Sequence, residues 1–369
     1  MYMKTIVISV LALLVLQHAV KLCFKLDYHK HIFNHYPGPC HQVQGMGIGS
    51  EDMHLIDNGT VFISSGYRLQ GNSPAYDKFY SENNVTGRIY LFDMNNPKKE
   101  VQEMSLTSTK EFDKERFQPH GISAWEDKKT GKLYLYAVNH ERDGEEKIEK
   151  FLVSVAKLSL QHLKSYFGDP TIRKMNDVVA TGDDSFYFTN SHTFGSNAGL
   201  LLELISLMAL SDVGVHDGKG YRTVADGISV ANGIQMSRDG KYVFVAGSMG
   251  HDLKIYERRN DNSLTLKQSY VFHSFPDNIM EDPVSGDLYI AFHPIGHLLF
   301  HHFVDHSLEA PSQVLQVKLK EGTVSSVTEL FVDDGHLVSG SSVAVVYKKK
   351  MLIGSVINKL VYCDVTVPL

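Results

Sequence analysis

Residues 176–190 read NDVVATGDDSFYFTN: a polar pair, an apolar run, a tight turn and a second apolar run. Gly and Asp at the centre of this stretch favour a tight turn, and the aromatic residues after it favour a β-strand. The same order of features recurs along the chain. The second apolar runs follow turns near residues 59, 131, 184, 240, 286 and 350.

These six recurrences indicate a repeat fold. Units of roughly 50 to 60 residues with about four strands each are typical of β-propeller blades. Further strands are expected at residues 88–94, 253–257 and 313–319, and no linker divides residues 40–369. We therefore predict an all-β fold, a six-bladed β-propeller spanning residues 26–369 as one domain.

A short polar or small pair precedes each turn by about 8 to 11 residues. In a propeller the innermost strand of each blade starts beside the central channel, so equivalent positions converge on one axis. Asn and Asp also start strands merely as turn formers, but their recurrence in four blades favours a shared site. The six pairs are Glu51-Asp52, His120-Gly121, Asn176-Asp177, Asn232-Gly233, Asp277-Asn278 and Gly340-Ser341.

Converging carboxylate and amide oxygens are the donors of a hard cation, and a mixed set of this size favours Ca²⁺. Zinc would require His or Cys, and Mg²⁺ would retain more water. Asp52 and Asp177 are the next residues along two of these strands, so strand alternation directs them toward a second site deeper in the channel. The expected ligands of the first ion are Glu51, Asn176, Asn232, Asp277 and Asn278.

Ordered motifs surround these polar pairs: Gly49-Ser50-Glu51-Asp52, Pro119-His120-Gly121-Ile122-Ser123, Asn176-Asp177-Val178-Val179-Ala180, Ala231-Asn232-Gly233-Ile234 and Pro276-Asp277-Asn278-Ile279. They are followed by His293-Pro294 and by the C-terminal stretch from Gly340 to Cys363. In this order, over about residues 40–363, the motifs resemble the paraoxonase family of arylester and lactone hydrolases.

The resemblance implies a propeller closed by a disulfide between Cys40 and Cys363, with two calcium ions per chain. The catalytic ion would use the five ligands named above. The structural ion would use Asp52, Asp177 and the backbone carbonyl of Ile122. Family members hydrolyse lactones and aryl esters, and some hydrolyse organophosphate triesters.

The resemblance also assigns a histidine dyad to His120 and His140. A general base beside the metal would activate water, and Asp277 is a competing nucleophile or base. His192 and His293 are weaker candidates for the pocket wall.

We expect a calcium-dependent carboxylic ester hydrolase. The alternative is a membrane-tethered, non-catalytic relative that assists the assembly of ion channels or other membrane proteins.

Departures from the family pattern concern the substrate pocket. Ser191 stands where the family usually has Asp, Phe292 where a free Cys is common, and Val230 where a larger aromatic residue is usual. The loop that reads Tyr67-Arg68-Leu69-Gln70 also differs from the best-known members.

The N-terminus carries an apolar run from Ile6 to Leu16, which suits a signal-peptide core better than a full span of about 20 residues. Gln17 makes a poor cleavage site, so residues 1–25 are either a signal peptide or an uncleaved anchor. Secretory entry would place the propeller outside the cell or on the lumenal side of a membrane. Glycosylation acceptors at Asn58 and Asn84 fit that route.

The composition supports these expectations. The chain has 369 residues, 43% of them hydrophobic, a net charge of −6 and a sequence pI near 6.3. An acidic globular chain has no electrostatic reason to bind nucleic acid. The expected partners are a small ester or lactone and, through the N-terminal segment, a membrane or lipid.

Overall fold

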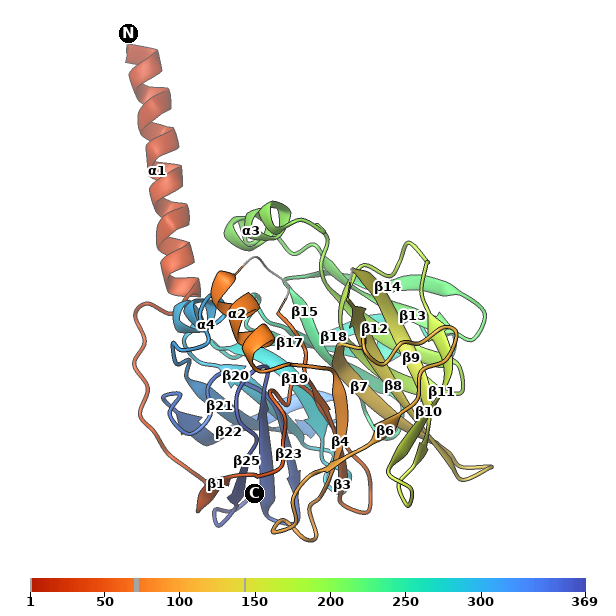
Figure 1. Ribbon diagram of the computed structural model, residues 1–369. Helices are drawn as coiled ribbons and strands as arrows, with labels where there is room; N and C mark the ends of the chain where they lie inside the picture. The colour runs from red at the N-terminus through yellow and green to blue at the C-terminus, as the bar shows by residue number, and fades with distance from the viewer. Residues whose placement is uncertain (1, 70–72, 143) are drawn as a thin grey trace.

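The computed structural model describes residues 2–69, 73–142 and 144–369. Within them the strands form six sheets around a common axis, which confirms the predicted six-bladed propeller (Figure 1). The first blade contains β2 (Met53–Leu55), β3 (Thr60–Ser65), β4 (Arg88–Asp93) and β5 (Gln102–Glu103). The second contains β7 (Pro119–Asp127), β8 (Lys132–Glu141), β9 (Glu145–Ser154), β10 (Ser159–Tyr166) and, at its outer edge, β6 (Ser105–Leu106).

The next three blades have four strands each and include the strands expected at residues 253–257 and 313–319. The third blade contains β11 (Lys174–Gly182), β12 (Ser185–His192), β13 (Ser211–Asp217) and β14 (Tyr221–Ile228). The fourth contains β15 (Ala231–Met236), β16 (Tyr242–Gly247), β17 (Asp252–Arg258) and β18 (Leu264–Val271). The fifth contains β19 (Phe275–Glu281), β20 (Leu288–His293), β21 (Ser312–Lys320) and β22 (Thr323–Asp333).

The sixth blade joins the two ends of the propeller. It contains β23 (Ser341–Tyr347), β24 (Lys350–Ser355), β25 (Val361–Asp364) and β1 (Cys40–Gln42). Cys40 lies directly opposite Cys363 in the antiparallel ladder of β1 and β25, and a disulfide joins them across 323 residues of sequence. The predicted pairing of these two cysteines is confirmed.

The core consists of apolar layers between neighbouring blades. In β3, Val61 and Ile63 pack toward the sixth blade, whereas Phe62 between them packs toward the second. Successive side chains of a strand point to opposite faces, and both faces of a blade are buried. This explains why the strands read as continuous apolar runs rather than as alternating polar and apolar residues.

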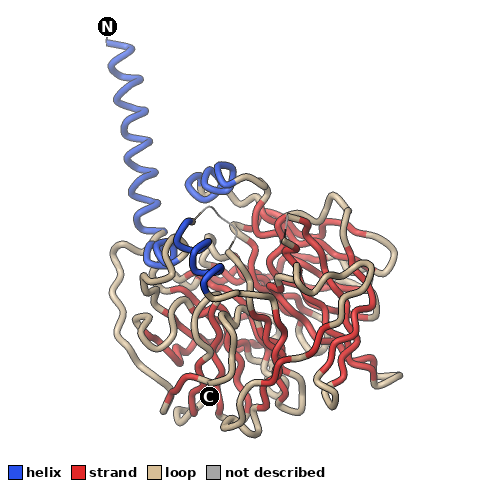
Figure 2. The backbone as a smooth tube through the Cα atoms, viewed as in Figure 1, coloured by secondary structure: helices blue, strands red, loops and turns tan. Residues whose placement is uncertain are grey.

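The four helices of the described residues lie at one end of the propeller (Figures 1 and 2). They are α1 (Tyr2–Lys25), α2 (Pro74–Glu82), α3 (Asn197–Ser206) and α4 (Gly296–His302). Helix α1 projects away from the blades and has no buried residue. It is the one helix in the described part of the chain that is long and apolar enough to cross a membrane, a test that a signal sequence also passes.

Candidate functional site

The polar pairs lie where the innermost strands leave regular pairing. In the second to fifth blades the ladder between the first two strands shifts register across the pair, for example between Met175 and Val178. Such irregularities free residues from the ladder and redirect their side chains. Asn176 and Asp177 therefore lie outside the regular ladder, and their side chains can turn toward the central axis.

Two glycines allow the blades to approach at this point. A Cβ atom on Gly121 would lie 2.2 Å from Asp177 Oδ1, and one on Gly233 would lie 2.6 Å from the Cα atom of Asn278. Neither distance is compatible with a side chain. The second residue of these two pairs must therefore be glycine, because the Asp or Asn of the next blade occupies the space that a side chain would need.

The structure brings together the oxygen donors expected for the first ion. The Nδ2 group of Asn278 donates a hydrogen bond of 3.0 Å to Glu51 Oε1. Four oxygens of these expected ligands are buried and have no hydrogen-bond donor among the described residues: Glu51 Oε2, Asn176 Oδ1, Asn232 Oδ1 and Asn278 Oδ1. Because buried acceptors are normally satisfied, these four oxygens fit the shell of a cation.

The electrostatics of Glu51 also favour a cation at this position. Burial, and next the charge of Asp277, raise the pKa of Glu51 well above its ordinary value. Carboxyl groups alone do not complete the shell, since no three His, Cys, Asp or Glu side chains in the described ranges are grouped as metal ligands. A cation at this point would need the neutral Asn oxygens as part of its donor set, and such a set fits Ca²⁺ better than a transition metal.

The side chains expected at the second ion, Asp52 and Asp177, each contact the adjacent blade. Asp52 Oδ2 accepts a hydrogen bond of 2.7 Å from the backbone N–H of Ile122, and Asp177 Oδ2 accepts one of 2.7 Å from Ile234. Burial and the charge of Glu51 raise the pKa of Asp52, and burial and the charge of Asp52 raise that of Asp177. Mutual repulsion of buried carboxyl groups again favours a cation.

The two predicted catalytic histidines are in direct contact. His120 Nδ1 lies 2.8 Å from His140 Nε2, and His120 Nε2 lies 3.2 Å from Glu51 Oε1. Both rings are buried. Burial lowers the pKa of His120 to about 4 and also lowers that of His140, so both rings are neutral at pH 7.

Asp277 has its own imidazole partner. His293 Nε2 lies 2.8 Å from Asp277 Oδ2, and both side chains line the same cavity. Two imidazoles thus adjoin the expected metal ligands, one beside Glu51 and one beside Asp277.

The arylesterase family matches residues 35–365, a range that includes all six blades. The chain belongs to the arylesterase family. It is 37% identical over 325 residues to serum paraoxonase/arylesterase 1 of Homo sapiens, with 88% of each chain covered. It is 35% identical over 331 residues to serum paraoxonase/lactonase 3 of Rattus norvegicus, with 89% of each chain covered. The resemblance inferred from the motifs is confirmed.

Solved structures extend the likeness at the level of fold alone. A luciferin-regenerating enzyme is similar with a TM-score of 0.54 and 11% identity, over 90% of this chain and 100% of that chain. At such low identity the match supports the propeller and says nothing further about chemistry.

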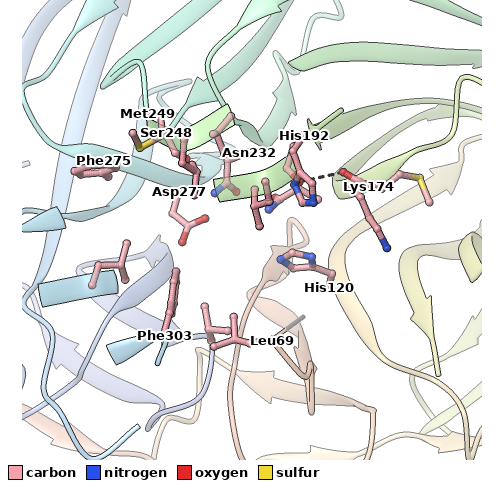
Figure 3. Close-up of a pocket in the computed structure, with 18 of the residues that line it drawn as sticks. Leu69, His120, Lys174, His192, Asn232, Ser248, Met249, Phe275, Asp277 and Phe303 are labelled. Carbon is pink, nitrogen blue, oxygen red and sulfur yellow. Dashed lines mark hydrogen bonds between the residues drawn. The ribbon is translucent and has the colours of Figure 1, made fainter. Parts of the chain in front are cut away.

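In this arylesterase-family member a cavity of about 260 Å³ opens above the donor oxygens. Figure 3 shows Asp277, Asn232, His120 and His192 around one space, with Phe275, Met249 and Phe303 on its apolar side. A pocket with a few polar groups at one end and apolar walls elsewhere suits a small, mostly apolar ligand.

The departures from the family pattern lie in this region. His192 and Val230 line the cavity, and the hydroxyl of Ser191 lies 2.9 Å from Nδ1 of His192. Phe292 is instead fully buried in the layer between the fourth and fifth blades. Gln70 lies outside the described residues.

Sequence reasoning missed two neighbours of the histidine pair. The ring of Tyr67 stacks on His120 with a centroid distance of 4.2 Å, and Glu146 Oε2 lies 2.8 Å from His140 Nδ1. The sequence indicates of Tyr67 only that it belongs to a loop that differs from the best-known family members. Glu146 follows a hairpin turn and has no signal that separates it from the surface acid Glu145.

Proposed function

We propose that this chain is a calcium-dependent carboxylic ester hydrolase that acts on lactones and aryl esters. The observation that carries the proposal is one cavity lined by a contacting pair of imidazoles and by three residues with unpartnered buried oxygens, Glu51, Asn176 and Asn232. The relatives named arylesterase and lactonase support the same chemistry.

The first calcium would be held by Glu51, Asn176, Asn232, Asp277 and Asn278, and a second by Asp52, Asp177 and the carbonyl of Ile122. A bound calcium would supply Lewis-acid polarisation of the carbonyl and stabilise developing negative charge. The unpartnered oxygens and the raised pKa values of the acids support this assignment.

Side chains of the protein itself would accept and transfer the protons. His120 is neutral at pH 7 and adjoins the ligand Glu51, so its ring can take a proton from a water in the cavity. His140 contacts the other nitrogen of that ring and can orient it. Asp277, paired with His293, is the alternative nucleophile or base.

The segment of residues 1–25 would be a signal peptide or a retained anchor, and residues 26–369 would form the hydrolase domain. An exposed, apolar α1 fits entry into the secretory pathway and association with a membrane or lipid. Asn58 and Asn84 are exposed, as glycosylation acceptors must be.

The test is hydrolysis of an aliphatic lactone and of phenyl acetate by the purified chain in calcium, compared with Asn232→Ala. We expect turnover of both substrates by the parent and loss of turnover in the folded variant. A folded, calcium-loaded parent that turns over neither substrate would contradict the proposal. That result would favour the alternative of a non-catalytic accessory protein, which the relatives do not favour.

A further inference from the structure

The histidine pair continues outward into a second pair of charged groups. Glu146, in the first residues of β9, places Oε2 at 2.8 Å from His140 Nδ1. Its other oxygen, Oε1, accepts a hydrogen bond of 3.0 Å from Nζ of Lys174, the first residue of β11. The contacts therefore run without a gap from Glu51 through both rings to Lys174.

The contact between Glu146 and His140 is buried. The side chains of Glu146 and His140 are 9% and 4% exposed. In the described part of the chain neither Oε2 nor Nδ1 has a hydrogen-bond partner, although the two atoms lie 2.8 Å apart. The contact therefore has the distance but not the angle of a hydrogen bond, and χ2 of His is a soft torsion about which the ring can turn. Each atom is thus the available partner of the other.

The charge on Glu146 fixes the direction of the hydrogen bonds. Although burial opposes ionisation, the charges and hydrogen bonds of His140 and Lys174 lower the pKa of Glu146 to about 2. An ionised carboxylate only accepts hydrogen bonds, so Nδ1 of His140 carries the proton. A neutral His140 then accepts at Nε2 from His120 Nδ1–H, which leaves His120 Nε2, 3.2 Å from Glu51 Oε1, without a proton.

We infer that Glu146, held by Lys174, is a positioning residue that sets the tautomers of both histidines and balances positive charge on His140 during turnover. This inference rests on the proposed hydrolase function. When water loses a proton to His120 Nε2, the Nδ1 proton passes to His140 Nε2 and the hydroxide adds to the ester carbonyl. The proton returns along the same path to the leaving alkoxide when the C–O bond breaks.

Substitution of Glu146 separates positioning from structure. Glu146→Gln keeps the size of the side chain but removes its charge, so kcat on the lactone and on phenyl acetate should fall by about 10-fold to 10²-fold while KM hardly changes. Glu146→Asp keeps the charge and should recover most of that loss. The matched control is Glu145→Gln, because the Glu145 side chain is 50% exposed and pairs with Lys147 and not with a ring, so this change should leave kcat unchanged.

A spectroscopic readout makes the inference testable without turnover. The Nδ1 proton of His140 should give a resonance downfield of the amide protons, and this resonance should be absent or shifted upfield in Glu146→Gln. An inactive parent that shows this resonance would overturn the hydrolase function and leave the pairing intact. A parent without the resonance, or a Glu146→Gln variant with the parent's kcat, would overturn the role of Glu146.

Discussion

At the scale of single residues, His120 is the proposed base that activates water. His120→Gln retains hydrogen bonding but cannot act as a base, so lactone turnover should fall by roughly 10²-fold or more. The melting temperature and calcium affinity should hardly change, since the ring lies beside the expected ligand Glu51 and is not itself an expected ligand. Steady-state kinetics and calcium titration measure both. Unchanged turnover would move the role to Asp277 and His293.

Substitution of Glu51 tests whether a cation offsets the charge of this buried carboxylate. Because burial and Asp277 raise its pKa in the folded chain, ionised Glu51 lowers stability as the pH rises above the ordinary Glu value of about 4.3. Glu51→Gln should therefore raise the melting temperature of the calcium-free chain at pH 8, with a smaller gain at pH 5. In calcium the same change should lower the melting temperature. Loss of stability in both conditions would contradict the assignment of Glu51 as a ligand.

The residues that sequence reasoning found and missed differ in one physical respect. Asn176, Asn232 and Asp277 occupy a repeated position, so the fold symmetry predicts that they converge. Glu146 reaches His140 from the start of a different strand, through one side-chain conformation. No period in the sequence encodes such a contact.

At the scale of elements, the site depends on close approach between innermost strands. Gly121→Ala would place a Cβ atom 2.2 Å from Asp177 Oδ1 and 2.5 Å from the Asp177 Cα atom, so β7 and β11 must separate. We expect a loss of about 1–3 kcal/mol in the free energy of unfolding, together with weaker calcium binding. Gly220→Ala is the control, since nothing lies within 4 Å of its Cβ position. Equal denaturant midpoints for the two variants would contradict the packing argument.

The strands were predictable where both of their faces are buried. The run in β12 places Phe186 and Phe188 toward the second blade and Tyr187 toward the fourth, so aromatic residues continue without a polar gap. Helix α3, by contrast, was not anticipated. Its Leu200 and Leu204 line the cavity whereas Leu201 and Leu202 are exposed, and such a short apolar run has no periodicity that separates helix from strand.

At the scale of the whole molecule, the disulfide closes the ring of blades. The chain-entropy model gives a bond that spans this much sequence a contribution on the order of 5 kcal/mol. A chain with both Cys40→Ser and Cys363→Ser should melt several degrees lower in calorimetry. Cys23→Ser is the control, because Cys23 is free and exposed on α1. A double variant that melts like the parent would show that blade packing alone closes the propeller.

The measurement that bears most directly on a calcium-dependent hydrolase is turnover of an aliphatic lactone and phenyl acetate through removal and return of the ion. The unpartnered oxygens of Glu51, Asn176, Asn232 and Asn278 predict that turnover requires calcium. We expect chelation to abolish hydrolysis of both substrates and added calcium, but not added magnesium, to restore it. Hydrolysis that continues in the fully chelated chain, or that never occurs in the calcium-loaded chain, would contradict this.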